Sequence, residues 1–536
     1  MRNSIAPAPL HIPRIGIGLL AGALVFIFMS TTGATAQAQS DSVRGTVRVS
    51  GIFIDEEGNR AVDPFTQNLY KGVALSLLNF SAVSANGLRF TADARNLSLS
   101  NRDIALGLGK SARWKAAFSE RQSRRVYTFN GDRFTRRDMY AGSFWGQVND
   151  YIRVFADLGQ TVRRGDIARG LDPSAPEALI PADYTHSHYT GGVKFGHERS
   201  MLELSYRESV YDDGPAASAD QNGRRYRGSF AIPAPRYDRW NVNGGFTRFE
   251  RAFRQRADSI FSNAAWGGLR YHDKNGFTAK YSFAFDRTRR TGDLVATDNI
   301  QNAITFAKNW SKDGGATLGV RYASVDDISN DLRTTGVFGQ TWIKLGERTT
   351  AQGGFGDEQT AVEKGHPLTG ERSATRIFAS LTHREKHFSG KARIENRVTN
   401  NDDIGSKSAF DRYGLDVSVS HLEYGELRLA YDYRDGSYSY QYEKYNLQDH
   451  SLNGDFTSVE IKRMWAGASG SYTRSRKSSD AESFYLTLWW KTKMDNQRYL
   501  ELAYTAYNHD QYDDPAPLYR RYYTANVAQL SLLWEL

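Results

Sequence analysis

An arginine-rich stretch is the densest set of side chains in this sequence that could do binding chemistry. Tyr127, Phe129 and Phe134 are interleaved with its cations. Arginine presents a planar fork of donors that fits carboxylates and phosphates in a bidentate manner. The stretch could therefore contact an acidic partner group such as a haem propionate, or the phosphates of lipopolysaccharide. The alternative is that it is a solvated long loop with no binding role. The arginines are Arg121, Arg124, Arg125, Arg133, Arg136 and Arg137.

Other groupings of reactive residues fall short of a catalytic or metal site. His186, His188 and His197 lie around one expected strand and lack the carboxylates that would complete a metal-ligand set. The acidic run at 326–331 has neither the glycine nor the terminal glutamate of a calcium-binding loop. No Gly-x-Ser-x-Gly nucleophile turn is present. We therefore predict that the chain is not an enzyme and holds no metal or cofactor itself.

The absence of cysteine limits the chemistry further. With 0 Cys the chain has no disulfide and cannot attach a c-type haem or hold a thiolate iron–sulfur cluster.

The formal charge of the chain is +9. Removing Arg2 and Arg14 with the N-terminal segment leaves 9 − 2 = +7, which indicates a mildly basic surface or interior. Nucleic acid is not an expected partner, because the N-terminus carries an export signal.

That signal occupies residues 1–38. Arg2 and Arg14 form a positive region, Ile15–Met29 is a short apolar run, and small residues such as Ala36-Gln37-Ala38 follow it. The apolar run is shorter than the ~20 residues of a spanning helix, so a secretory signal peptide is favoured over a membrane anchor. Residues 39–536 are expected to form a single domain, since no shift in composition divides them.

The elements that must position the charged side chains are strands. From Ala265 to Arg287 apolar and polar residues alternate on either side of a break at 272–276, so aromatic rings share one face and charges the other. The same alternation recurs along the whole chain, which is typical of a membrane barrel with an apolar outer face. Charges on the lipid face would cost about 2–4 kcal/mol each near the midplane. We therefore expect the following residues to face the lumen: Lys280, Asp286, Lys391, Arg393, Glu395, Arg428 and Asp432.

Connections between the expected strands alternate between short turns and long polar loops, such as His272–Gly276 and Thr288–Asn299. The last strand resembles the C-terminal insertion signal of outer-membrane barrels, with an apolar face formed by Leu530, Leu532, Trp534 and Leu536. We predict an all-β fold, a transmembrane antiparallel β-barrel of about 26 strands with short periplasmic turns and long extracellular loops. The expected location is the outer membrane of a Gram-negative-type bacterium.

A barrel of this size should enclose a wide lumen, because diameter grows with strand number and 16–18 strands already leave an aqueous channel. An open lumen of such width would leak solutes, so we expect an inward loop or another protein to occupy it. No segment before the first strand is large enough to be a globular plug, which counts against a TonB-dependent transporter.

One part of the sequence resembles a known family. The stretches Leu69–Leu75, Leu88–Leu97, Asn101–Asp103 and Trp114–Tyr127 are similar to the start of the MtrB/PioB-type barrels, the porin components of porin–cytochrome conduits. The resemblance implies a sheath through which a periplasmic multihaem c-type cytochrome carries electrons across the outer membrane. It further implies that haem belongs to that partner, and that an extracellular multihaem cytochrome could accept the electrons.

We therefore predict a non-enzymatic outer-membrane barrel that insulates a multihaem cytochrome and contacts outer-membrane lipid and lipopolysaccharide. Two alternatives remain open at this point. One is a large porin or channel for anionic or oligomeric solutes, and the other is a transport barrel for polysaccharide or lipopolysaccharide.

Overall fold

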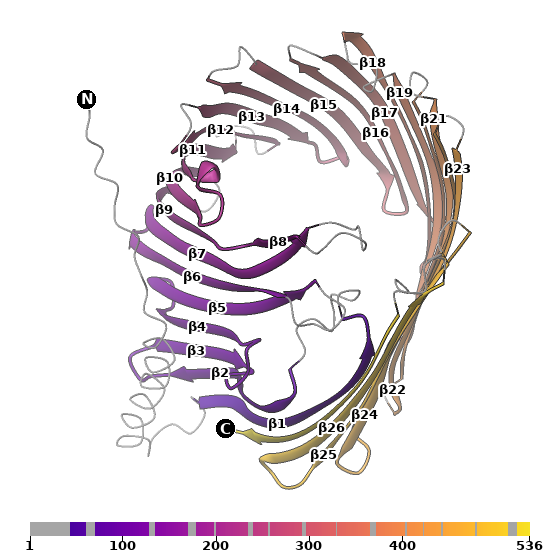
Figure 1. Ribbon diagram of the computed structural model, residues 1–536. Coiled ribbons are helices and arrows are strands. Elements are labelled where there is room, and N and C mark those ends of the chain that lie inside the picture. The colour runs from indigo at the N-terminus through magenta and orange to yellow at the C-terminus, as the bar shows by residue number, and fades with distance from the viewer. Residues whose placement is uncertain are drawn as a thin grey trace, which may run out of the picture.

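The computed structural model is an all-β ring of antiparallel strands (Figure 1). The strands follow one another around the ring in chain order, from indigo β1 to yellow β27. The structure describes residues 43–60, 70–127, 134–169, 178–197, 200–233, 239–255, 258–291, 296–327, 330–364, 371–401, 405–421, 423–440, 443–477, 480–512 and 522–536.

The strands of this ring are mostly 12 to 16 residues long. Their bounds are β1 Val43–Gly58, β2 Gly72–Val83, β3 Leu88–Arg95, β4 Asp103–Lys110, β5 Trp114–Val126, β6 Phe134–Asn149, β7 Ile152–Arg169, β8 Ala178–Pro181, β9 Tyr184–His197, β10 Ser200–Asp213, β11 Gln221–Pro233, β12 Trp240–Phe253, β13 Ser259–His272, β14 Phe277–Arg290, β15 Ala296–Ser311, β16 Gly314–Asp326, β17 Asp331–Lys344, β18 Thr349–Lys364, β19 Arg372–Arg384, β20 Phe388–Asn401, β21 Ser406–His421, β22 Gly425–Tyr440, β23 Glu443–Ser458, β24 Met464–Lys477, β25 Ala481–Lys493, β26 Arg498–Gln511 and β27 Tyr523–Glu535.

The ring closes by pairing its first and last strands. β1 pairs antiparallel with β27 in a register that runs from Thr46 opposite Glu535 to Gly58 opposite Tyr523. β8 pairs only with the end of β7, and β7 pairs directly with β9. Within the described residues, 27 strands less β8 leave the 26 strands of the barrel wall, which confirms the predicted architecture. Closure pairs the backbone groups of every wall strand, as a bilayer requires.

Side-chain alternation sorts the two faces as predicted. Large apolar side chains are exposed on the outer face, among them Ile377 at 58% and Ile394 at 54%. Ile394 lies opposite Ala379 and Tyr413, so the outward residues form rows across neighbouring strands. An exposed apolar belt around a closed barrel is the surface that lipid covers. No helix within the described ranges is long and apolar enough to cross a membrane.

Turns at one rim are tight. In the β13–β14 turn the Asp273 carboxylate accepts hydrogen bonds from the backbone N–H groups of Asn275 and Phe277, at 2.9 and 2.7 Å. Gly276 completes this turn with φ +77°, a conformation that glycine adopts without strain. The turn lies within the 272–276 break predicted from the sequence. Such short turns mark the periplasmic rim of outer-membrane barrels.

Several connections at the other rim are shorter than the sequence suggested. The predicted loop Thr288–Asn299 is shortened, because β14 continues to Arg290 and β15 begins at Ala296. The polar stretch from Asp435 to Ser451 is also mostly strand, since β22 continues to Tyr440 and β23 begins at Glu443. The pairing of β22 with β23 continues here because a strand that extends beyond the membrane can carry polar residues on both faces. Tyr438 lies opposite Tyr445 in this extension, with ring centroids 6.4 Å apart. The predicted signal peptide, residues 1–38, lies outside the described residues.

Candidate functional site in the barrel lumen

The wide lumen is the first feature of the candidate site. For strands about 4.8 Å apart and tilted by about 40°, a circular ring of this many strands has a backbone diameter of roughly 50 Å. Inward side chains leave a clear width of roughly 40 Å, compared with roughly 30 Å for a small folded domain. The ring is therefore wide enough to enclose a folded protein, provided that nothing else fills it.

The predicted luminal charges all lie on the inward face, although in different parts of the wall. Asp286 on β14 accepts a hydrogen bond from the Ser262 hydroxyl at 2.6 Å, and Lys280 lies on the same strand and face. Lys391, Arg393 and Glu395 follow one another on β20. Asp432 and Arg428 share β22, where Arg428 pairs with Glu426 at 2.6 Å.

One section of the wall, from β19 to β22, repeats a three-residue arrangement of charge. Two arginines lie directly opposite each other, and a carboxylate two residues toward the periplasmic rim on the second strand pairs with the first arginine. On β19 and β20 these residues are Arg376, Arg397 and Glu395, with Arg376 Nε 2.6 Å from Glu395. Glu395 also pairs with Arg393, and it is only 9% exposed.

The arrangement recurs on β21 and β22. Arg412 lies opposite Arg434, and Asp432 accepts from the Nε atoms of both, at 2.6 and 3.3 Å. Like charges directly opposite in a sheet repel each other, so the bridging carboxylate makes the arginine pair tolerable. The four opposed arginines and Glu395 line one cavity of about 770 Å³.

The arginine stretch at 121–137 is divided between the two faces of the wall. Arg121, Arg125 and Arg137 face the lumen, where Arg121 lies 4.0 Å from Asp103 and Arg125 lies 5.4 Å from the Tyr127 ring. Arg124 and Arg136 face outward, because adjacent strand residues point to opposite faces. Arg133 lies outside the described residues.

The expected loop is largely strand, since β5 continues to Val126 and β6 begins at Phe134. The outward pair lies near the extracellular rim. Arg124 stacks on the Tyr70 ring at 4.4 Å, and Arg136 donates to Gln122 at 2.7 Å and to Asp138 at 3.2 Å. The stretch therefore places two arginines on the membrane side of the wall and three on the luminal side.

A second basic cavity, on β6 to β12, was not found by the sequence reasoning. Its volume is about 520 Å³, and its luminal cations are Arg137, Arg207, Arg225 and Arg251. Arg224 also borders it, but this residue belongs to the outward set of β11 and lies 3.9 Å from Glu208. Tyr184, Tyr211 and His186 complete one side. Alternation along each strand could have placed the arginines at 207, 225 and 251 on the inner face. Their proximity depends on the register between neighbouring strands, which the sequence does not show.

Two of the three histidines noted in the sequence, His186 and His188, are neighbours on the inner face of β9. The rings of His186 and His188 are 6.0 Å apart, and His186 lies 6.4 Å from the Tyr211 ring. The His188 ring occupies the space over Gly159, where a Cβ atom would lie 2.1 Å from Cε1. In the described part of the chain no three His, Asp or Glu side chains are grouped as a metal site would need.

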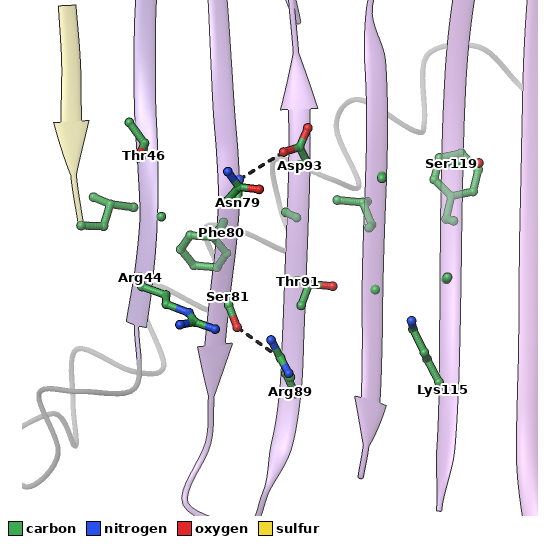
Figure 2. A pocket seen from close by; sticks show the side chains of 18 of the residues that line it. Arg44, Thr46, Asn79, Phe80, Ser81, Arg89, Thr91, Asp93, Lys115 and Ser119 are labelled. Atoms are coloured by element: carbon green, nitrogen blue, oxygen red, sulfur yellow. Dashed lines mark hydrogen bonds between the residues drawn. The ribbon is translucent and has the colours of Figure 1, made fainter. Parts of the chain in front are cut away.

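A third cavity, of about 820 Å³, lies on the inner face of β1 to β6 (Figure 2). Arg44, Arg89 and Lys115 lie near one end of it, and Asp93 lies toward the other. Arg89 donates to the Ser81 hydroxyl at 3.3 Å, and Asp93 accepts from the Asn79 N–H at 3.2 Å. This cavity holds both signs of charge, unlike the cavity on β6 to β12.

The predicted insertion signal lies on β27, the strand that closes the barrel, and on the residue that follows it. Leu530 and Trp534 are exposed at 49% and 37% on the outer face of β27, in one row with Leu532. Leu536 follows the strand, is 43% exposed, and donates its backbone N–H to the Gly45 carbonyl at 2.9 Å. The opposite face of the strand is buried at Ser531, whose hydroxyl lies 2.9 Å from that of Ser50 on β1. The strand thus combines a lipid-facing stripe with the seam that closes the barrel.

These features define an outer-membrane β-barrel, located in the outer membrane of a Gram-negative bacterium. Solved structures with the same fold include the siderophore receptor PirA from Pseudomonas aeruginosa, with 9% identity over 79% of this chain and 80% of that one and a TM-score of 0.51. The FrpB iron transporter from Neisseria meningitidis (F3-3 variant) has 10% identity over 93% of this chain and 82% of its own, with a TM-score of 0.53.

The F5-1 variant of FrpB, in its apoprotein form, gives 9% identity over 92% and 81% of the two chains and a TM-score of 0.50. At such identities the likeness establishes the fold alone. No protein-family model matches the sequence. No curated protein matches it either.

Proposed function

We propose that this barrel is a sheath that holds a multihaem c-type cytochrome across the outer membrane for transmembrane electron transfer. The observation that carries the proposal is the closed wall of 26 strands, whose estimated clear width exceeds that of a small domain. Outer-membrane transporters with a protein plug have 22 strands, so this ring has room for a larger occupant.

The charges of the inner wall support the same proposal. Arginines line the lumen on β6 to β12 and again on β16 to β22, and bidentate guanidinium groups suit the propionates and acidic side chains of a haem protein. The chain has no cysteine of its own, so covalently attached haem must belong to a partner. The sequence resemblance to MtrB/PioB-type barrels points to the same kind of partner.

Co-purification tests this function directly. The chain would be affinity-tagged in its native host and extracted from outer membranes in a mild detergent, with untagged cells as the control. We expect a partner that stains for covalent haem and gives a c-type absorbance spectrum. A barrel that purifies free of haem, is stable alone and conducts ions in a planar bilayer would overturn the proposal.

A channel for anionic solutes is the second candidate. The basic cavity on β6 to β12 favours it, because its described lining residues include four luminal arginines and no carboxylate. The same bilayer measurement separates the two functions, since a solute channel would conduct without any partner and would select anions over cations. Removal of luminal arginines would then reduce that selectivity.

A further inference from the structure

The cavity on β6 to β12 contains an arginine pair that lacks the bridging carboxylate found elsewhere in the lumen. Arg207 on β10 lies directly opposite Arg225 on β11. Cβ atoms of directly opposite residues are about 4.5–5.5 Å apart, and both side chains are half-buried. The neighbouring strands add Arg251 on β12 and Arg137 on β6 to the same cavity.

Comparison with the arginine pairs on β19 to β22 shows which group is missing from this cavity. On β20 and β22 the position two residues toward the periplasmic rim from the second arginine carries Glu395 or Asp432. The corresponding position on β11 is Arg227, which faces the lumen with Arg225. The arrangement that elsewhere contains two cations and one anion therefore contains three cations here.

The residues around this cavity do not supply the missing charge. Among the described residues, Arg137, Arg207, Arg225 and Arg251 form no ion pair with any carboxylate. The nearby acids on this face lie outside the cavity lining. Asp213 accepts from the Tyr211 hydroxyl at 3.2 Å, and Asp157 is separated from Arg207 by Thr190 on the intervening strand.

We propose that this cavity is a binding site for a small multivalent oxyanion of the phosphate or polycarboxylate class. The anion would take the place of the bridging carboxylate between Arg207 and Arg225, with Arg251 and Arg137 on its other sides. Each guanidinium can offer two parallel N–H donors to such an anion. The Tyr184 hydroxyl and the His186 ring supply further polar groups at the edge. A volume of about 520 Å³ is within the range of small-molecule sites.

The site does not depend on the proposed sheath function, because it is formed entirely by residues of this chain. Isothermal titration calorimetry on the purified full-length barrel in detergent tests it, with pyrophosphate and citrate as separate probes. We expect saturable binding at one site for at least one probe. Tighter binding of pyrophosphate would assign the phosphate class, and tighter binding of citrate the polycarboxylate class.

Three variants make this test specific. Arg207→Gln with Arg225→Gln should weaken binding about tenfold or more, as the loss of charge-assisted contacts predicts. The matched control is Lys280→Gln with Lys391→Gln, which removes the same charge from distant luminal positions and should retain affinity within about twofold. Arg227→Asp should abolish binding, because the new carboxylate would occupy the place of the anion, as Asp432 does on β22.

Heat-dependent mobility on denaturing gels verifies that each variant is a folded barrel. Equal weakening in the glutamine pair and in the lysine control would mean that only the general charge of the lumen attracts anions, and would overturn the site. Absence of saturable binding of either probe to the folded wild-type barrel would overturn it as well. Neither result bears on whether a cytochrome co-purifies, so the two proposals fail independently.

Discussion

Arg207 and Arg225 lie directly opposite each other in the barrel wall, and no carboxylate of the described residues pairs with either, whereas Arg412 and Arg434 lie opposite each other with Asp432 bonded to both. Both pairs face the lumen, and the position two residues toward the periplasmic rim on the second strand holds Arg227 in one case and Asp432 in the other. The section of the wall on β21 and β22 therefore balances its arginines with a carboxylate, whereas the section on β10 and β11 keeps an excess of positive charge.

Removing the bridge should destabilise the barrel. Asp432→Asn leaves Arg412 and Arg434 facing each other without a counter-charge, and because both arginines are partly exposed we expect a loss of only about 1 kcal/mol in the free energy of unfolding. Urea unfolding in detergent, followed by tryptophan fluorescence, measures it. The control is Asp416→Asn, a luminal carboxylate on β21 that forms no ion pair among the described residues. Equal losses in both variants would contradict the bridging role.

A carboxylate introduced beside Arg207 and Arg225 should stabilise the barrel. Arg227→Asp replaces a third cation by the anion found at the corresponding position of β22, so we expect a gain of about 0.5–1 kcal/mol in the absence of added anions. The same urea titration measures this gain, and added pyrophosphate should narrow the difference by stabilising only the wild type. Arg227→Gln is the control, and it should give a smaller gain. A destabilised Arg227→Asp barrel would show that the local geometry does not permit the bridge.

Much of this barrel could be predicted from the sequence, because period-two alternation reports the face of each strand residue without knowledge of its neighbours. The luminal side of Lys280 and Glu395 and the outward side of Trp534 follow from it. The pairing of Arg207 with Arg225, and of His186 with Thr161, depends on register between strands. Register is set by the turns and by the whole ring, which no local pattern records.

The division of the arginine stretch shows the same limit. Arg124 and Arg125 are adjacent in sequence, so a loop would let both reach one partner, but in β5 they point to opposite faces. The polar composition of this stretch resembled a loop because the strand continues beyond the apolar belt. Alternation of charge alone carries no signal that distinguishes a strand above the membrane from a loop.

The outward arginines should bind lipopolysaccharide and the luminal ones should not. Arg124→Gln with Arg136→Gln should lower the lipopolysaccharide that co-purifies with the barrel about two- to fivefold, since each loses a charge-assisted contact to phosphate. Arg121→Gln with Arg125→Gln removes the same charge from the inner face and is the control. The bound lipid is measured by silver staining or phosphate analysis. Equal retention in both variants would contradict the assignment by face.

Barrel assembly should depend on the outer stripe of β27. Trp534→Asp places a charge on the lipid-facing side of the closing strand, where it lies opposite Arg498 on β26 and Val47 on β1. We expect a smaller folded fraction in the outer membrane, because the substitution removes an aromatic ring from the lipid-facing stripe near the membrane–water interface, where such rings are favoured. Heat-modifiable mobility and fractionation measure the folded fraction. Gln529→Asp, on the inner face of the same strand, should assemble far better.

The turn between β25 and β26 should make a small contribution to stability that depends on pH. Asp495 accepts hydrogen bonds from the backbone N–H groups of Gln497 and Arg498, at 3.0 and 2.8 Å. Its pKa is lowered chiefly by the Gln497 N–H, and further by the Arg498 guanidinium. Folding therefore favours the carboxylate, and the contribution is present above the ordinary Asp pKa of about 3.9. It is lost as the pH falls through the lower pKa of the folded state.

Asp495→Asn removes this dependence. We expect the variant to have a slightly lower urea midpoint than the wild type at pH 7, and the difference between them to vanish as the pH falls below about 3.9. The control is Asp150→Asn in the β6–β7 turn, whose carboxylate forms no hydrogen bond or ion pair among the described residues; its midpoint should track the wild type at every pH. A constant difference between Asp495→Asn and the wild type down to strongly acidic pH would show that the turn is held by geometry alone, without help from the charge.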